Sequence, residues 1–182
     1  MSELTDVQLA ALEGTERACE GNARAYLNEA RILLGRKGYV RAFFLALTGL
    51  EEAAKTQLIA DCRGGQISLH RLRRAFKDHN HRFAYLKRSL SEAASPAGSL
   101  PPLEINYEPS DGKPFSALRE ASLYVGLSDS LSPEAPWDTI TEEEARRAVA
   151  ALHQELQAMK VASLVPGGAT TKNVYFALRI KP

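Results

Sequence analysis

The spacing of apolar residues is the feature of this sequence that most constrains its fold. Apolar or small side chains recur every three or four residues through most of the first 90 positions, the period of an α-helix buried on one face. The pattern is most regular after Ser68, at Leu69, Leu72, Phe76, His79, Phe83, Leu86 and Leu90. Only His79 interrupts the apolar character of this stripe. We therefore expect an all-α bundle.

Glycines and capping residues predict where the helices begin and end. A first helix is expected to end near Gly35 and a second to begin at Gly38, and the short connection makes them an antiparallel hairpin. Ser68 is a competent N-cap for a third helix that extends to about residue 90. Thr141 and Glu144 form a capping box that begins a last amphipathic helix.

The remaining segments have weaker patterns. Residues 94–113 are rich in Ser, Pro, Gly and Asp and are expected to form a long loop, followed by a short helix over 115–125. Apolar residues alternate near the C-terminus and within the long loop, which predicts a small two-stranded β appendage. These residues are Val174, Phe176, Leu178 and Ile180, with Leu103, Ile105 and Tyr107 as the candidate partner strand.

Length and composition favour one domain in a reducing compartment. The chain has 182 residues, 45% of them hydrophobic, which is enough for a single core. Cys19 and Cys62 lack disulfide or zinc-ligand spacing, and the sequence contains neither an HExxH motif nor a dinucleotide-binding fingerprint, so we expect neither a metal nor a cofactor. The N-terminal residues do not form a signal peptide, and no apolar run is long enough to span a membrane. A cytoplasmic protein that does not contact membranes is expected.

Charge is distributed unevenly along the chain. The formal net charge is +1. Residues 71–88, however, contain seven Lys and Arg residues and one acidic residue, Asp78. This segment therefore has a formal charge of +6, and the remainder of the chain has −5. Such clusters attract the phosphates of RNA or DNA. The same cluster could also be the solvated outer face of a bundle helix, and charge alone does not distinguish the two.

Two polar residues occupy core-facing positions. His79 lies on the apolar stripe of the third helix, and Glu51 shares the buried stripe of the second. An inward carboxylate costs several kcal/mol unless it is paired, so we expect a histidine or arginine from the third or fourth helix to pair with Glu51. Such a pair could prepare a histidine to accept a proton, or it could be only a structural ion pair.

An ordered set of short motifs resembles a known family, the AbiV-type abortive-infection proteins of bacteria, which belong to the HEPN superfamily of helical bundles. The resemblance spans roughly residues 15–160. It depends on Asn22-Ala23, Leu27, Ala30, Gly38-Tyr39, Ala42, Glu51-Glu52-Ala53-Ala54-Lys55, Phe76-Lys77-Asp78-His79, Leu123-Tyr124-Val125 and Trp137. It implies a HEPN-like antiparallel bundle of four to five helices, which we place over residues 1–162. Residues 163–182 are expected, from their own pattern, to form a linker and a strand that packs on the bundle.

The resemblance also implies a type of active site. Many HEPN proteins are metal-independent ribonucleases with an Arg-x4-6-His motif at a dimer interface. Arg74 and His79 have this spacing, but Arg74 lies off the stripe that contains His79. The segment from Arg119 to Tyr124 matches the motif better by its position in the chain, but it has Tyr124 where the motif has histidine. A phenol with a pKa near ~10 is a poor base at neutral pH.

We therefore expect a composite catalytic pocket and an adjacent RNA-contact surface. The catalytic candidates are His79, Arg119, Tyr124, Glu51 and Glu52, and the RNA-contact candidates are Arg74, Lys77 and Arg82. The expected function is an antiphage effector that cleaves RNA, or binds RNA and impairs translation. It would act as a homodimer and respond to a phage-encoded protein. The alternative is a non-catalytic helical module that binds a protein partner or phage trigger.

Overall fold

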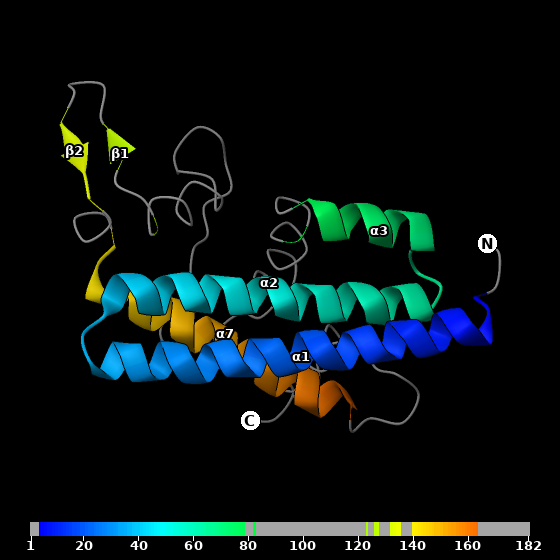
Figure 1. Ribbon diagram of the computed structural model, residues 1–182. Coiled ribbons are helices and arrows are strands. Elements are labelled where there is room, and N and C mark those ends of the chain that lie inside the picture. Colours follow the sequence, from blue (N-terminus) through cyan, green and yellow to red (C-terminus); the bar gives the residue numbers. More distant parts are fainter. Residues whose placement is uncertain are drawn as a thin grey trace, which may run out of the picture.

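The computed structural model describes residues 4–78, 82, 123, 126–127, 132–135 and 140–163. Its helices are α1 (Asp6–Gly35), α2 (Tyr39–Arg63), α3 (Leu69–Lys77) and α7 (Glu142–Ser163). A short antiparallel ladder pairs β1 (Gly126–Leu127) with β2 (Pro133–Glu134). In Figure 1 the two long helices α1 and α2 lie side by side, with α3 along α2 and α7 crossing the pair.

The α1–α2 hairpin has clear end signals. Thr5 and Gln8 form a capping box at the start of α1, in which each residue's side chain accepts a hydrogen bond from the other's backbone N–H. The turn between the helices places Lys37 in the left-handed region, with φ 59°. Two helices joined by so short a turn must run antiparallel, as Figure 1 shows.

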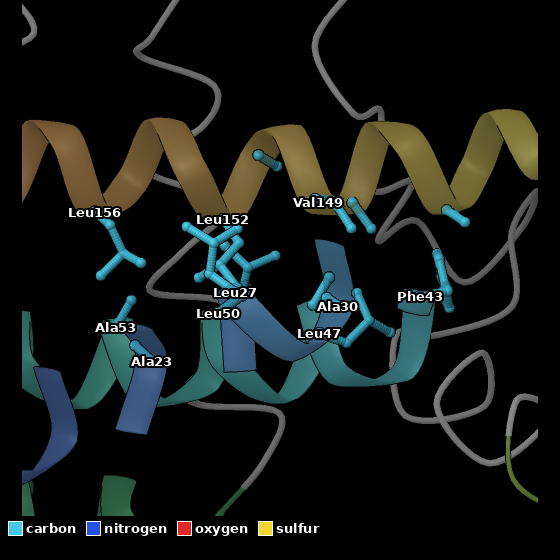
Figure 2. Packing of buried hydrophobic residues seen from close by; sticks show 14 of the residues in the cluster. Ala23, Leu27, Ala30, Phe43, Leu47, Leu50, Ala53, Val149, Leu152 and Leu156 are labelled. Atoms are coloured by element: carbon cyan, nitrogen blue, oxygen red, sulfur yellow. The ribbon is translucent and has the colours of Figure 1, made fainter. Parts of the chain in front are cut away.

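The main core lies where α1, α2 and α7 meet. Figure 2 shows Leu152 and Leu156 of α7 directed at leucines and alanines of the other two helices. From the order of these contacts, α7 runs parallel to α2 and antiparallel to α1. The central members are Ala23, Leu27, Ala30, Leu47, Leu50, Ala53, Val149, Leu152 and Leu156. The many alanines let the three helix backbones approach closely.

Gly49 marks the closest approach in this core. A Cβ atom at this position would lie 2.5 Å from Cδ2 of Leu152 and 3.2 Å from Cβ of Tyr26. Both distances are shorter than ordinary van der Waals contact. The hydrogen side chain of Gly49 therefore permits α1 and α7 to pack against the same face of α2.

A second, smaller core joins α3 to the hairpin. It contains Leu12 and Cys19 of α1, Leu58, Ile59 and Cys62 of α2, Ile67, and Leu72 and Ala75 of α3. Only Leu72 and Ala75 of the nine residues of α3 are buried. A helix this short is not stable alone in water. Its position therefore depends on its contacts with α2.

The structure confirms most of the predicted helical layout. The hairpin, the Ser68 N-cap and the Thr141–Glu144 capping box are all present. One uninterrupted third helix is wrong, because α3 ends at Lys77 and Asp78 is extended, with φ −116° and ψ 110°. Aspartate side chains compete with helical backbone hydrogen bonds, which favours an end here.

Other predicted segments lie outside the described residues. These are the loop over 94–113, the helix over 115–125 apart from Leu123, and both strands of the predicted β appendage. The β1–β2 ladder is a different pairing that the sequence did not predict. Within the described parts of the chain, no helix has the length and apolar content needed to cross a membrane.

Candidate functional site

A buried ion pair connects α2 to the residues that follow α3. Glu51 and Arg82 are each only 4% exposed. Nη2 and Nε of Arg82 lie 2.9 and 3.2 Å from Oε2 of Glu51. Hydrogen bonds between a guanidinium and a carboxylate are stronger than neutral ones and fix the orientation of both groups. The pairing expected for an inward Glu51 is therefore present, with arginine as the partner.

Arg82 also binds the end of α3. Its Nη1 donates to the carbonyl oxygens of Phe76 at 2.6 Å and Ala75 at 3.3 Å. The last carbonyls of a helix have no partner within the helix, so these bonds cap α3. The backbone N–H of Arg82 also donates to the carbonyl of Asp78 at 3.3 Å. Arg82 therefore holds the end of α3 against α2.

A second polar group lies beside this pair, between α1, α2 and α3. Nζ of Lys55 lies 2.5 Å from Oε1 of Glu52 and 5.8 Å from the centre of the Phe76 ring. Burial, and next the negative charge of Glu52, raise the pKa of the Cys19 thiol to about 11. Cys19 is therefore a protonated thiol at neutral pH and not a candidate nucleophile.

The outward face of α3 is entirely basic. Its exposed side chains include His70, Arg71, Arg73, Arg74 and Lys77, and the helix contains no acidic residue. None of these five has an ionic partner in the part of the chain that the structure describes. The first two turns of α7 differ, because Arg146 and Arg147 lie 2.6 and 2.5 Å from glutamates of the same helix. The α3 surface therefore has positive charge that is not neutralised locally.

A third buried polar contact lies on another face of α2. Glu155 of α7 is fully buried and accepts a hydrogen bond from the side-chain amide of Gln57. This contact fixes the register of α2 against α7. Because this contact joins α2 to α7 and not to α3, we assign it a structural role.

Comparison with known proteins identifies the family. A family model described as AbiV (HEPN_AbiV) matches residues 11–157. The chain belongs to the AbiV family of HEPN proteins. The matched range begins in α1, ends in α7 and includes Glu51, Arg82 and all of α3, so the family pattern contains the whole candidate site. No curated protein and no solved structure matches this chain.

The structure describes five of the eight predicted site residues. Glu51 and Glu52 lie on α2 at the junction with α3, and Arg74 and Lys77 are exposed on α3. Arg82 is not on the surface as an RNA contact would be, because Glu51 and the end of α3 hold its guanidinium inside. His79, Arg119 and Tyr124 lie outside the described residues, so their roles in this AbiV-family chain stay predictions.

Sequence reasoning missed two buried polar residues of the described region, Glu155 and Gln57. It did place Lys55 near Glu52, three residues away on the same helix, and the structure has their ion pair. Glu155 could have been found, because it follows Ala148 by seven residues and precedes Met159 by four, on the core-facing side of α7. Gln57 had no comparable signal, since amides occur on exposed helix faces more often than in cores.

Proposed function

We propose that this chain is an abortive-infection effector that acts on RNA, with the outward face of α3 as its RNA-contact surface. The observation that carries the proposal is the unneutralised basic face of α3, fixed beside the buried Glu51–Arg82 pair. Phosphate groups neutralise such a face and release counterions, which favours association. Membership in the AbiV family supports the abortive-infection role.

The RNA-contact residues of the proposal are those on the exposed side of α3. Arg71, Arg74 and Lys77 follow one another at intervals of three and lie along one side of the helix. Guanidinium groups bind phosphate with two parallel hydrogen bonds, whereas an ammonium acts as a point charge. The proposal therefore adds Arg71 to the predicted contacts Arg74 and Lys77 and removes Arg82.

The cleavage step of the proposal uses the predicted His79, Arg119 and Tyr124. In the sequence, His79 immediately follows Asp78, the residue at which α3 ends. His79 would take the proton of the 2′-hydroxyl, which attacks the adjacent phosphorus. Arg119 would stabilise the charge that develops on the phosphate, and Tyr124 would donate a proton to the leaving 5′-oxygen. Homodimerisation, a cytoplasmic location and a phage-encoded trigger complete the proposal.

The test combines RNA binding with RNA cleavage. Purified protein is incubated with labelled single-stranded RNA in EDTA, next to His79→Ala and next to the triple variant Arg71→Gln/Arg74→Gln/Lys77→Gln. Arg146→Gln is the matched control, because it removes one surface arginine that is already paired. We expect EDTA-resistant cleavage that His79→Ala abolishes, RNA binding that the triple variant abolishes, and no change in the control.

Each part of the proposal has its own contradicting result. Cleavage that persists in His79→Ala would remove that residue from the mechanism. RNA binding equal to wild type in the triple variant would contradict the α3 surface. The wild-type protein is also tested with lysate of phage-infected cells as the source of an activator. If it then neither binds nor cleaves RNA, the result would favour the non-catalytic interaction module.

A further inference from the structure

We propose that Glu51 and Arg82 are positioning residues, which orient the basic face of α3 for RNA without touching it. This inference rests on the proposed function and assigns a different role to two residues that the sequence placed in the catalytic and RNA-contact sets. It follows from the burial of both side chains, from the groups that Arg82 binds, and from the small size of α3.

Neither Glu51 nor Arg82 is accessible to a bound polynucleotide. Side chains that are 4% exposed cannot reach a phosphate of a bound polynucleotide without leaving their place. The guanidinium of Arg82 already donates to Oε2 of Glu51 through two nitrogens and to two backbone carbonyls through the third. These four hydrogen bonds engage all three nitrogens of the guanidinium. Direct RNA contact by Arg82 would therefore break bonds that fix α3.

The position of α3 depends on the Glu51–Arg82 pair in this proposal. The nine residues of α3 bury only Leu72 and Ala75, and their apolar contact is small compared with that of the long helices. Arg82 connects the final turn of this helix to α2 through Glu51, and its own backbone is bonded to Asp78. The same contacts hold together Asp78 and Arg82, the two ends of the connection that contains His79. Loss of the pair would therefore free the basic face from α2.

Two possible roles of Glu51 predict different changes in RNA affinity when the residue is replaced by glutamine. If nearby charge alone governed RNA binding, Glu51→Gln would remove a negative charge and RNA would bind more tightly or unchanged. If Glu51 positions α3, the same substitution weakens the hold on Arg82 and RNA binds less tightly. A purely electrostatic role and a positioning role therefore predict opposite changes.

The experiment measures RNA affinity by fluorescence anisotropy over a series of salt concentrations. The variants are Glu51→Gln, Arg82→Lys and, as the matched control, Glu142→Gln, which removes an exposed glutamate paired with Arg146. We expect Glu51→Gln to weaken binding by about tenfold, the size of one charge-assisted hydrogen bond. The control should bind as well as wild type or slightly better.

Arg82→Lys provides the second readout, because it keeps the charge and removes the planar guanidinium. The positioning role predicts weaker binding together with a smaller salt slope, since several α3 contacts are lost at once. Amide hydrogen exchange in α3 should also become faster. This variant and the exchange measurement keep the test decisive if Glu51→Gln does not fold.

The outcomes separate this inference from the proposed function. If the triple α3 variant loses RNA binding but Glu51→Gln and Arg82→Lys bind like wild type, the α3 surface stands and the positioning role is wrong. The positioning role is also wrong if Glu51→Gln binds more tightly than wild type. If the triple variant binds RNA normally, the proposed function itself fails.

Discussion

The two sides of α2 differ in what holds them to their neighbours. Toward α7 the contact is mainly apolar, with Leu47, Leu50 and Leu152 fully buried and Gly49 allowing close approach, and the Gln57–Glu155 hydrogen bond is its buried polar contact. Toward the end of α3, a buried ion pair and the Lys55–Glu52 contact accompany a smaller apolar cluster. One long helix thus connects a large apolar core to a short helix held by a small apolar cluster and a buried ion pair.

Because of this difference, we expect the stability of the fold and the proposed RNA binding to depend on different contacts. Apolar packing is insensitive to small changes in charge, and its loss destabilises the entire fold. A buried ion pair contributes little net stability compared with apolar residues of the same shape, but it specifies one arrangement. We therefore expect the α1–α2–α7 core to determine whether the chain folds, and the Glu51–Arg82 pair to determine where α3 lies.

The largest loss of stability is expected from Leu152→Ala in the large apolar core. Leu152 is fully buried between α1 and α2, and truncation of such a leucine costs about 2–5 kcal/mol. Urea denaturation measures the free energy of unfolding. Val7→Ala is the control, because Val7 is 80% exposed and its truncation should cost less than about 0.5 kcal/mol. Equal losses in the two variants would show that α7 is not part of the folded core.

A smaller and more local loss is expected from Arg82→Met. Breaking a buried ion pair costs about 3–5 kcal/mol when the remaining charge stays buried. Here α3 can separate from α2 and admit water to Glu51, so we expect roughly half that loss in the free energy of unfolding. Hydrogen exchange should accelerate in α3 and remain slow at the α2–α7 contact. Uniform acceleration in both regions would contradict the comparison between them.

The same comparison explains how much the sequence could predict. The three- and four-residue spacing of apolar residues also puts Leu47, Leu50, Leu152 and Leu156 on the inward faces of their helices, and the structure buries all four. It also predicted that Glu51 points inward and needs a cationic partner. It could not name Arg82, because pairing across 31 residues depends on where α3 ends. Asp78 favours a helix end there, but the regular apolar stripe continues beyond it, so local spacing alone did not place that end.

A modest loss is expected from Gly49→Ala, and it should depend on Leu152. The new Cβ atom would lie 2.5 Å from Cδ2 of Leu152, an overlap of a kind that costs about 1–3 kcal/mol. The better helix propensity of alanine offsets about 1 kcal/mol of this cost. In a Leu152→Ala background the closest contact is absent, so Gly49→Ala should be neutral or stabilising there. Identical costs in both backgrounds would mean that α2 and α7 do not approach as closely as described.

The smallest change at neutral pH concerns the cysteines of the second core. Burial and the nearby Glu52 raise the pKa of Cys19 to about 11, and burial also raises the pKa of Cys62. Since the folded state favours the protonated thiol of Cys19, the associated stability is complete below pH 9 and is lost as pH rises toward 11. Stability at pH 7 is unaffected by this group.

Alkylation with iodoacetamide, followed by mass spectrometry, measures this shift at each cysteine. The rate at Cys19 should rise about tenfold per pH unit up to nearly pH 11, whereas a free thiol with a pKa near ~8.5 levels off much earlier. Both cysteines pack in the apolar cluster that includes Leu72 and Ala75 of α3. Arg82→Met should therefore accelerate alkylation at pH 8 by opening this cluster, and the surface variant Arg146→Gln should not. An unchanged rate in Arg82→Met would show that the apolar contacts alone hold α3 in place.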